Sequence, residues 1–308
     1  MNSPNKILSL KGSGAVRTFL WHKNAREAAR SVSKVATAGG YHELDVRRYE
    51  FGTTRKSDTL FILGSGRSIN SLQLEHFLEI SANVSVGINA WALHDFVPDA
   101  YCFETGKSQQ GPAEDTLFIT NRLNRPAVTN KAPEFFFLRP TLPATVKNLV
   151  RVPGDLATPG KLYGRANLIP TRLQNLRPDL NRLFKAIVAG NSPSNVLVDN
   201  GASVVRMVTL GFSQGFQNIV LTGVDLNDQP YFWLAPEYED RSTELDRLFP
   251  RQSGVPHSTL SAARRPFATD EVLTAMGDVL ASNYGVRLSV STSASSLSTS
   301  LPIYRWGS

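Results

Sequence analysis

The sequence predicts an α/β fold in which helices cover both faces of a mostly parallel sheet. Two observations carry this prediction. Short apolar runs typical of buried strands alternate along the chain with helical stretches. The first clear run, Thr59–Leu63, ends in Gly64-Ser65-Gly66, a turn typical of Rossmann-like strand–turn–helix units.

The composition is that of a globular protein. The chain has 308 residues, of which 41% are hydrophobic and 19% charged. A single cysteine, Cys102, excludes an internal disulfide and agrees with a reducing compartment. No apolar run reaches the ~18–20 residues of a membrane span, and the N-terminus lacks a signal-peptide pattern. We therefore expect a cytoplasmic protein.

Most of the excess positive charge lies near the N-terminus. The net charge is +7, and residues 1–60 contain eleven Lys or Arg against five Asp or Glu. We expect a basic arm at 1–57 and one Rossmann-like domain at 58–308. Within the arm, residues 15–37 predict a helix that either lies on an anionic membrane or packs on the body. Nucleic acid is not expected, because few aromatic residues interleave the charges.

The further elements follow from apolar runs, glycines and caps. Strands are expected at Asn83–Ile88, Tyr101–Phe103, Thr116–Thr120, Glu134–Leu138, Ile219–Thr222 and Val286–Val290. Helices are expected at Ser71–Ile80, Leu173–Ile187, Ser203–Leu210 and Thr269–Tyr284. Leu142–Lys161 predicts a loop, and 226–268 a long lid segment. The strand Thr59–Leu63 precedes all of these.

The glycine turn predicts a phosphate site. Glycines allow close approach of the backbone, and free N–H groups at a helix start favour an anion. The alternative is a tight turn that holds no ligand. The dinucleotide fingerprint is incomplete, because Ile69 takes its third glycine position and Asn89 stands where an acid is expected. No Gly-Lys-Ser/Thr follows, so the turn is not a P-loop.

Four segments, in order, resemble the glycosyltransferase family 42 sialyltransferases, which use CMP-sialic acid. They are the turn 62–69, Gly87-Ile88-Asn89-Ala90-Trp91, the segment 200–225 with its Thr222-Gly223-Val224-Asp225, and Pro256-His257-Ser258. Together they cover roughly residues 58–290. Residues 1–57 have no counterpart in the family, and relatives of this architecture also transfer Kdo.

The resemblance implies a sialyltransferase-like variant of the GT-A fold and a metal-independent, inverting transfer from a CMP-activated sialic acid or Kdo to a bacterial surface glycan or glycolipid. It implies no metal and no cofactor besides the donor. His257 would be the catalytic base, and Arg264 and Arg265 would bind the sugar carboxylate or an anionic acceptor. The residues expected to bind the nucleotide are Gly64, Ser65, Gly66, Ser68, Asn89, Asn200, Gly201, Ser203, Gly223, Asp225, Tyr231 and Tyr238.

Several alternatives stay open. His94 is a second candidate base, and Asp225-Leu226-Asn227-Asp228 resembles a metal-binding Asp-x-Asp. The fold also suits a pterin diphosphokinase or a flagellin-glycosylation accessory factor, and a kinase of this kind should need Mg²⁺ and ATP. A non-enzymatic nucleotide-binding scaffold is the third possibility. The protein is expected in the cytoplasm, including the inner face of the membrane, and its oligomeric state is open, a homo-oligomer included.

Overall fold

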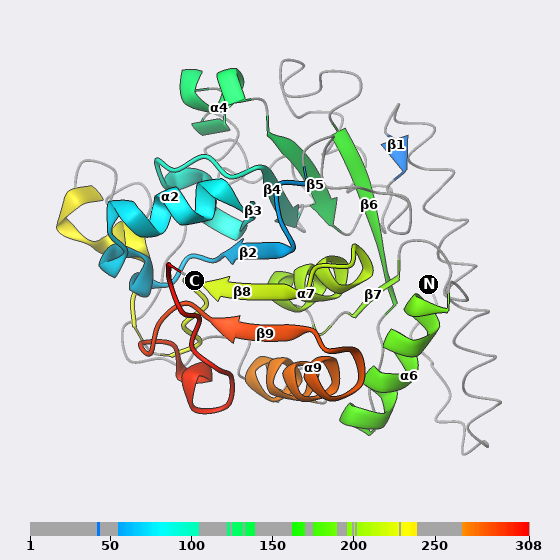
Figure 1. Ribbon diagram of the computed structural model, residues 1–308. Coiled ribbons are helices and arrows are strands. Elements are labelled where there is room, and N and C mark those ends of the chain that lie inside the picture. The colour runs from blue at the N-terminus through cyan, green and yellow to red at the C-terminus, as the bar shows by residue number, and fades with distance from the viewer. Residues whose placement is uncertain are drawn as a thin grey trace, which may run out of the picture.

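A computed structural model gives the arrangement of most of the chain (Figure 1). It describes residues 42–43, 55–104, 122–123, 125–131, 133–138, 162–169, 175–189, 196–198, 200, 202–227, 229–238 and 267–307. The predicted helix at 15–37, the strand Thr116–Thr120 and the loop Leu142–Lys161 lie outside these ranges.

The described strands form one nine-stranded sheet. The order is β1-β6-β5-β4-β3-β2-β8-β9, and β7 pairs with β6. Every pairing between two of these strands is parallel. The strands are β1 His42–Glu43, β2 Thr59–Leu63, β3 Val84–Ile88, β4 Ala100–Glu104, β5 Glu134–Leu138, β6 Leu162–Ile169, β7 Val196–Val198, β8 Asn218–Thr222 and β9 Arg287–Val290. The predicted parallel sheet is thus confirmed, whereas β1, β6 and β7 were not predicted.

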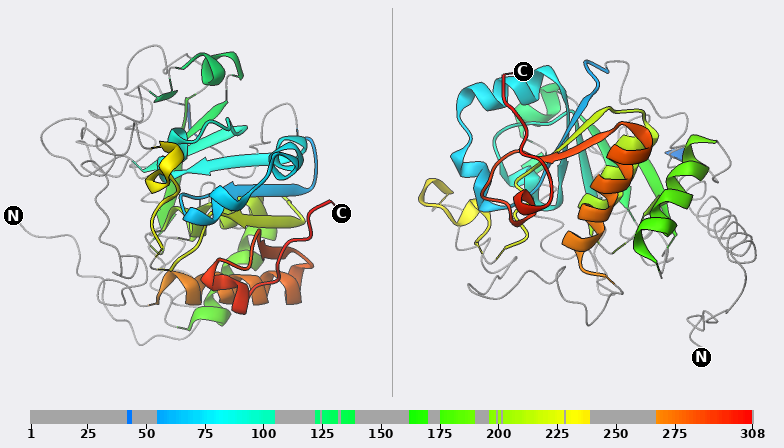
Figure 2. Two further views of the ribbon diagram at one scale, coloured as in Figure 1. Left: turned by 90° about the vertical axis from the view of Figure 1, so that its left-hand side faces the viewer. Right: turned by 60° about the horizontal axis from the view of Figure 1, so that its bottom comes forward.

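One face of the sheet is covered by three helices: α6 Leu176–Val188, α7 Ser203–Ser213 and α9 Thr269–Tyr284. Alternate strand residues such as Leu60, Ile62 and Leu221 pack against them. Figure 2 shows α6 and α9 side by side on this face. Nearly all of α7 is buried, because it lies over the middle of the sheet.

The other face is covered by shorter pieces. These are η1 Arg67–Ser71, α2 Leu74–Ala82, η2 Asn89–Leu93, α4 Pro126–Lys131, η3 Phe232–Leu234, η4 Pro236–Tyr238 and the end of the chain with Tyr304 and Trp306. The short turn η7 Ser296–Thr299 lies on the first face instead, where Leu297 belongs to the same core as α7 and α9. The intervening strand residues, such as Phe61, Leu63 and Val220, belong to this second core. Cover on both faces confirms the predicted α/β architecture.

The bounds of two helices show which helix ends the local sequence specifies and which it does not. The predicted bounds of α9 are confirmed, and Gly285 closes it in the left-handed conformation at φ +67°. The helix predicted at Ser71–Ile80 instead begins at Leu74, after the separate turn η1. Leu72 and Gln73 are extended between them, and the Gln73 N–H donates to Nδ1 of His76, 2.9 Å away.

The end of the basic N-terminal arm is attached to the body. Arg55 donates to the carbonyl oxygens of Gln214 and Gly215, at 2.9 Å each, and its guanidinium lies over the ring of Phe216. Lys56 pairs with Asp99. Contact of the arm with an anionic surface stays a prediction.

The C-terminal segment pairs with the edge strand and covers the second core. Ile303 forms a parallel bridge with Val290 of β9. Trp306 stacks on Phe61, with ring centroids 5.6 Å apart, and Tyr304 meets the same ring edge-on. Within the described ranges, none of the helices combines the length and hydrophobicity that a membrane span requires.

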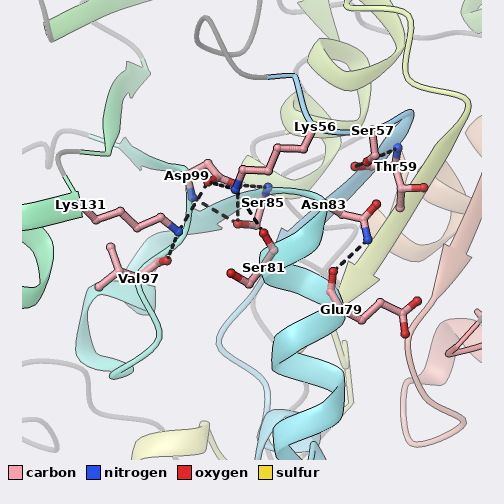
Figure 3. A network of polar contacts seen from close by, with 10 residues as sticks. All are labelled: Lys56, Ser57, Thr59, Glu79, Ser81, Asn83, Ser85, Val97, Asp99 and Lys131. Carbon is pink, nitrogen blue, oxygen red and sulfur yellow. Dashed lines mark hydrogen bonds and ion pairs between the residues drawn. The ribbon is translucent and has the colours of Figure 1, made fainter.

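A polar network joins the starts of β3 and β4 on the side away from the glycine turn (Figure 3). One oxygen of the Asp99 carboxylate accepts from the N–H and hydroxyl of Ser85, at 3.0 and 3.1 Å. The other oxygen pairs with Lys56 at 2.7 Å and Lys131 at 3.5 Å. Burial lowers the pKa of Lys131, and the opposing charge of Asp99 limits this effect.

We expect Asp99→Ala to lower the free energy of unfolding by about 2 kcal/mol, because it leaves polar partners without their acceptor. Asp58→Ala is the matched control, since Asp58 is 67% exposed and pairs with Arg55. That exposed pair should contribute at most ~0.5 kcal/mol. Urea unfolding of both variants measures the difference, and equal small losses would contradict a structural role for the Asp99 network.

Candidate functional site at the carboxyl edge of the sheet

Two turns meet where the neighbouring strands β2 and β8 end. The N–H of Gly64 donates to the carbonyl of Thr222, and the N–H of Gly66 donates to that of Gly223, both at 2.7 Å. Gly223 adopts the left-handed conformation at φ +67°. Because ligands of parallel α/β sheets bind at the carboxyl edge, these turns mark the candidate site.

The two turns are joined by a buried carboxylate. One oxygen of Asp225 accepts from the N–H of Ser68 at 2.9 Å, and the other accepts from the Ser68 hydroxyl at 2.5 Å. Both residues are buried. The carboxylate of Asp225 therefore occupies the place that the sequence analysis gave to a bound anion at the N–H of Ser68.

This geometry corrects one expectation about the glycine turn. The N–H groups of Gly64, Gly66 and Ser68 are used within the protein and are not free for a phosphate. The glycines are required for packing. A Cβ on Gly64 would lie 2.4 Å from the carbonyl oxygen of Gly223, and one on Gly66 would lie 2.4 Å from the carboxylate of Asp225.

The segment that holds the two predicted tyrosines packs on the same turn. Tyr231 forms an antiparallel bridge with Gly66, and the N–H of Phe232 donates to the carbonyl of Ser65 at 3.1 Å. Tyr231 stacks on Trp233, with ring centroids 4.4 Å apart. Tyr238 is buried and lies edge-on to Phe232, 5.4 Å between centroids. The structure thus brings Tyr231 directly to the glycine turn, with Tyr238 one aromatic ring further away.

Three other predicted residues lie at the ends of further parallel strands. Asn89 directly follows β3, whose Gly87 is in register with Leu63 of β2. Asn200 and Ser203 are buried at the start of α7, which follows β7. The Asn200 amide contacts the Thr269 hydroxyl at 3.5 Å, so the starts of α7 and α9 are adjacent. The N-cap residue of α7 is Ala202, whose methyl side chain cannot cap the helix.

His94, the second candidate base, lies in an aromatic cluster. Its ring stacks on Trp91, with centroids 4.5 Å apart, and on Phe77 at 5.2 Å. Its Nδ1 accepts from the N–H of Phe96 at 3.0 Å. Burial lowers the pKa of His94 to about 4, the charge of Asp95 opposes this shift, and Arg125 adds to it. The ring is therefore neutral at pH 7 and a weak base.

Four predicted site residues, His257, Arg264, Arg265 and Gly201, lie outside the described residues, as does Asp228 of the Asp-x-Asp-like motif. In the part of the chain that the structure describes, no group of three His, Cys, Asp or Glu is placed to hold a metal. The roles of these residues therefore stay predictions.

One further residue was missed by the sequence analysis. Arg67 lies between Gly66 and Ser68 with an exposed side chain. Its guanidinium makes no hydrogen bond or ion pair with another described residue. An arginine within a glycine turn at the ligand edge is a recognisable signal, because guanidinium groups bind phosphate and carboxylate in two-point contacts.

No known family model matches the chain, and no curated protein matches it. Two solved structures are similar. One is the crystal structure of the sialyltransferase CST-II in complex with a trisaccharide acceptor and CMP, with a TM-score of 0.42. The other is monomeric CstII, with a TM-score of 0.41. Each of the two has 15% sequence identity to this chain, and each match covers 80% of this chain and 86% of the other chain. At this distance the likeness says nothing about substrate or mechanism.

Proposed function

We propose that this protein is an inverting, metal-independent glycosyltransferase that uses a CMP-activated acidic sugar, sialic acid or Kdo. The observation that carries the proposal is the meeting of Gly64–Ser68, Gly223–Asp225 and Tyr231 at one edge of the parallel sheet. Gly64–Ser68 and Gly223–Asp225 belong to two of the segments in which the sequence resembles the family 42 sialyltransferases, and Tyr231 is one of the residues expected to bind the nucleotide. The acceptor would be a surface glycan or glycolipid.

In this proposal, different residues of the chain bind different parts of the CMP-sugar donor. The donor's phosphate would lie near Arg67 and Tyr231, beside the turn, because the N–H of Ser68 already binds Asp225. The start of α7, with Asn200, Gly201 and Ser203, offers further N–H groups. Asn89 would hold the ribose or the cytosine, and Tyr238 would donate to the leaving phosphate.

The transfer step requires a base. An imidazole nitrogen of His257 would take the proton of the acceptor hydroxyl, and the hydroxyl oxygen would attack the anomeric carbon. The bond between that carbon and the phosphate oxygen breaks, and CMP leaves with the bonding electrons. Arg264 and Arg265 would hold the carboxylate of the sugar or of the acceptor.

CMP should raise the thermal unfolding midpoint, since a ligand at 100 times its dissociation constant stabilises the folded state by about 2.7 kcal/mol. For a chain of this length this corresponds to a shift of roughly 4 °C. Arg67→Gln should unfold at the wild-type midpoint without ligand, because the side chain is exposed, and should lose most of the shift. Arg182→Gln, on the outer surface of α6, is the matched control.

His257→Ala should keep the CMP shift and lose transfer of the sugar. CDP, ATP and NAD are tested in parallel. A shift with ATP and Mg²⁺ but none with CMP would favour the kinase alternative and overturn the proposal. If CMP raises the unfolding midpoint but neither activated sugar is transferred, the proposal is overturned in favour of a non-enzymatic nucleotide-binding scaffold. Transfer at the wild-type rate in His257→Ala would remove this histidine from the mechanism.

A further inference from the structure

A row of buried hydroxyl groups lies on the second face of the sheet. The side-chain oxygens of Thr222, Ser289 and Ser291 are buried and form no hydrogen bond with any described residue. The residues themselves are 0%, 1% and 3% exposed. Buried polar atoms in folded proteins are nearly always hydrogen-bonded, to protein or to ordered water.

The strand register brings these three hydroxyls together. Leu221 of β8 is in register with Val290 of β9, so Thr222 and Ser291 are the next neighbours across the pair. The N–H of Ser291 donates to the carbonyl of Leu221 at 2.9 Å, which extends the ladder by one residue. Neighbouring strands are about 4.8 Å apart. Ser289 lies two residues before Ser291 and therefore on the same face.

The face itself is identified by its neighbours. Ile219, Leu221 and Val290 pack against the helices α7 and α9, whereas Val220 belongs to the second core. Because strand side chains alternate, Thr222, Ser289 and Ser291 all point to the second core. The three hydroxyls thus lie on the same face of two neighbouring strands, beside the apolar side chain of Val220.

The C-terminal segment covers the second core on its outer side. Phe61 of β2 is in register with Val220, which is in register with Ser289. Trp306 stacks on Phe61, and its indole N–H donates to the carbonyl of Ser291 at 3.0 Å. The hydroxyls therefore lie beside and beneath the Trp306 ring, where a nucleotide or sugar has no access.

We propose that Thr222, Ser289 and Ser291 form an internal water site, in which one ordered water bridges at least two of the three hydroxyls. Three hydroxyls left dry would each lose their hydrogen bonds to solvent without compensation. Buried waters typically make two to four hydrogen bonds to such groups, and a hydroxyl can both donate to and accept from them. The site does not depend on the proposed catalytic function.

Two variants and their combination test the site. Thr222→Val and Ser291→Ala each remove one hydroxyl with little change in volume. If the two hydroxyls bind the same water, each replacement should raise the equilibrium constant of unfolding about five-fold. The double variant should raise this constant by clearly less than the product, because both replacements act through one water.

Thr222→Val combined with Ser85→Ala is the control pair. Ser85 is buried at the other end of the sheet and bonded to Asp99, so its effect should multiply with that of Thr222→Val. Thr222→Ser retains the hydroxyl and should retain the water. Ser289→Ala is combined with each of the two replacements in the same way. Single replacements that stabilise the protein, or independent effects in all three pairs of hydroxyl replacements, would overturn the proposal.

A crystal structure of the wild-type protein at atomic resolution provides a test that needs no variant. We expect a density peak within hydrogen-bonding distance of Thr222 Oγ1 and Ser291 Oγ, or of Ser289 Oγ and one of these. An empty space, or direct hydrogen bonds of all three hydroxyls to protein atoms, would overturn the water site.

Discussion

Asp225→Ala is expected to lower the free energy of unfolding by about 3 kcal/mol. The replacement leaves the N–H and hydroxyl of Ser68 buried without their acceptor, and each such loss costs about 1–3 kcal/mol. Asp225→Asn keeps one carbonyl oxygen as acceptor and should cost about half as much. Urea unfolding at constant pH measures both changes.

The same carboxylate predicts strong coupling between the two turns. Ser68→Ala removes one of the two hydrogen bonds, so the double variant with Asp225→Ala should cost much less than the sum of the single changes. Asp278→Ala is the control, because Asp278 is 46% exposed and pairs with Arg177 on the surface. A loss below ~1 kcal/mol for Asp225→Ala would contradict the buried contact.

The buried ring of His94 is expected to make the protein sensitive to acid. Its pKa is about 4 in the folded protein and 6.5 when solvated. Between these values the unfolded chain binds a proton that the folded protein does not, so stability falls as the pH decreases from 6.5 to 4. The loss reaches about 3 kcal/mol near pH 4 and does not grow below it.

His94→Asn isolates this contribution. The asparagine carbonyl can replace Nδ1 as acceptor for the N–H of Phe96, while the variant has no imidazole to protonate. It should be less stable at pH 7, because it loses contacts with Trp91 and Phe77. Its free energy of unfolding should fall less between pH 6.5 and 4 than that of the wild type. Parallel profiles would show that His94 does not cause the acid sensitivity.

The central strands and the last helix could be predicted from local sequence. The apolar runs Thr59–Leu63 and Ile219–Thr222 are buried on both faces, which requires continuous hydrophobicity. The helix Thr269–Tyr284 has acids in its first turn and glycine directly after its end. These signals lie within the element itself, so they do not depend on the rest of the fold.

Other elements depend on contacts that local sequence does not contain. β6 carries Gly, Arg and Asn among its apolar residues, and β7 has only three residues. At the glycine turn, Ser68 was expected to bind the nucleotide, but its N–H and hydroxyl bind Asp225 from the neighbouring strand end. The turn was therefore located correctly, whereas the use of its N–H groups depended on a partner far along the chain.

The segment after β9 has a consequence for how molecules of this protein can associate. Val290 donates to the carbonyl of Pro302 at 3.0 Å and accepts from the N–H of Tyr304 at 2.7 Å. Exposed strand edges invite intermolecular sheet extension and aggregation. Here the outer side of Val290 is already hydrogen-bonded, so a second molecule cannot add a strand at this position without displacing the protein's own chain.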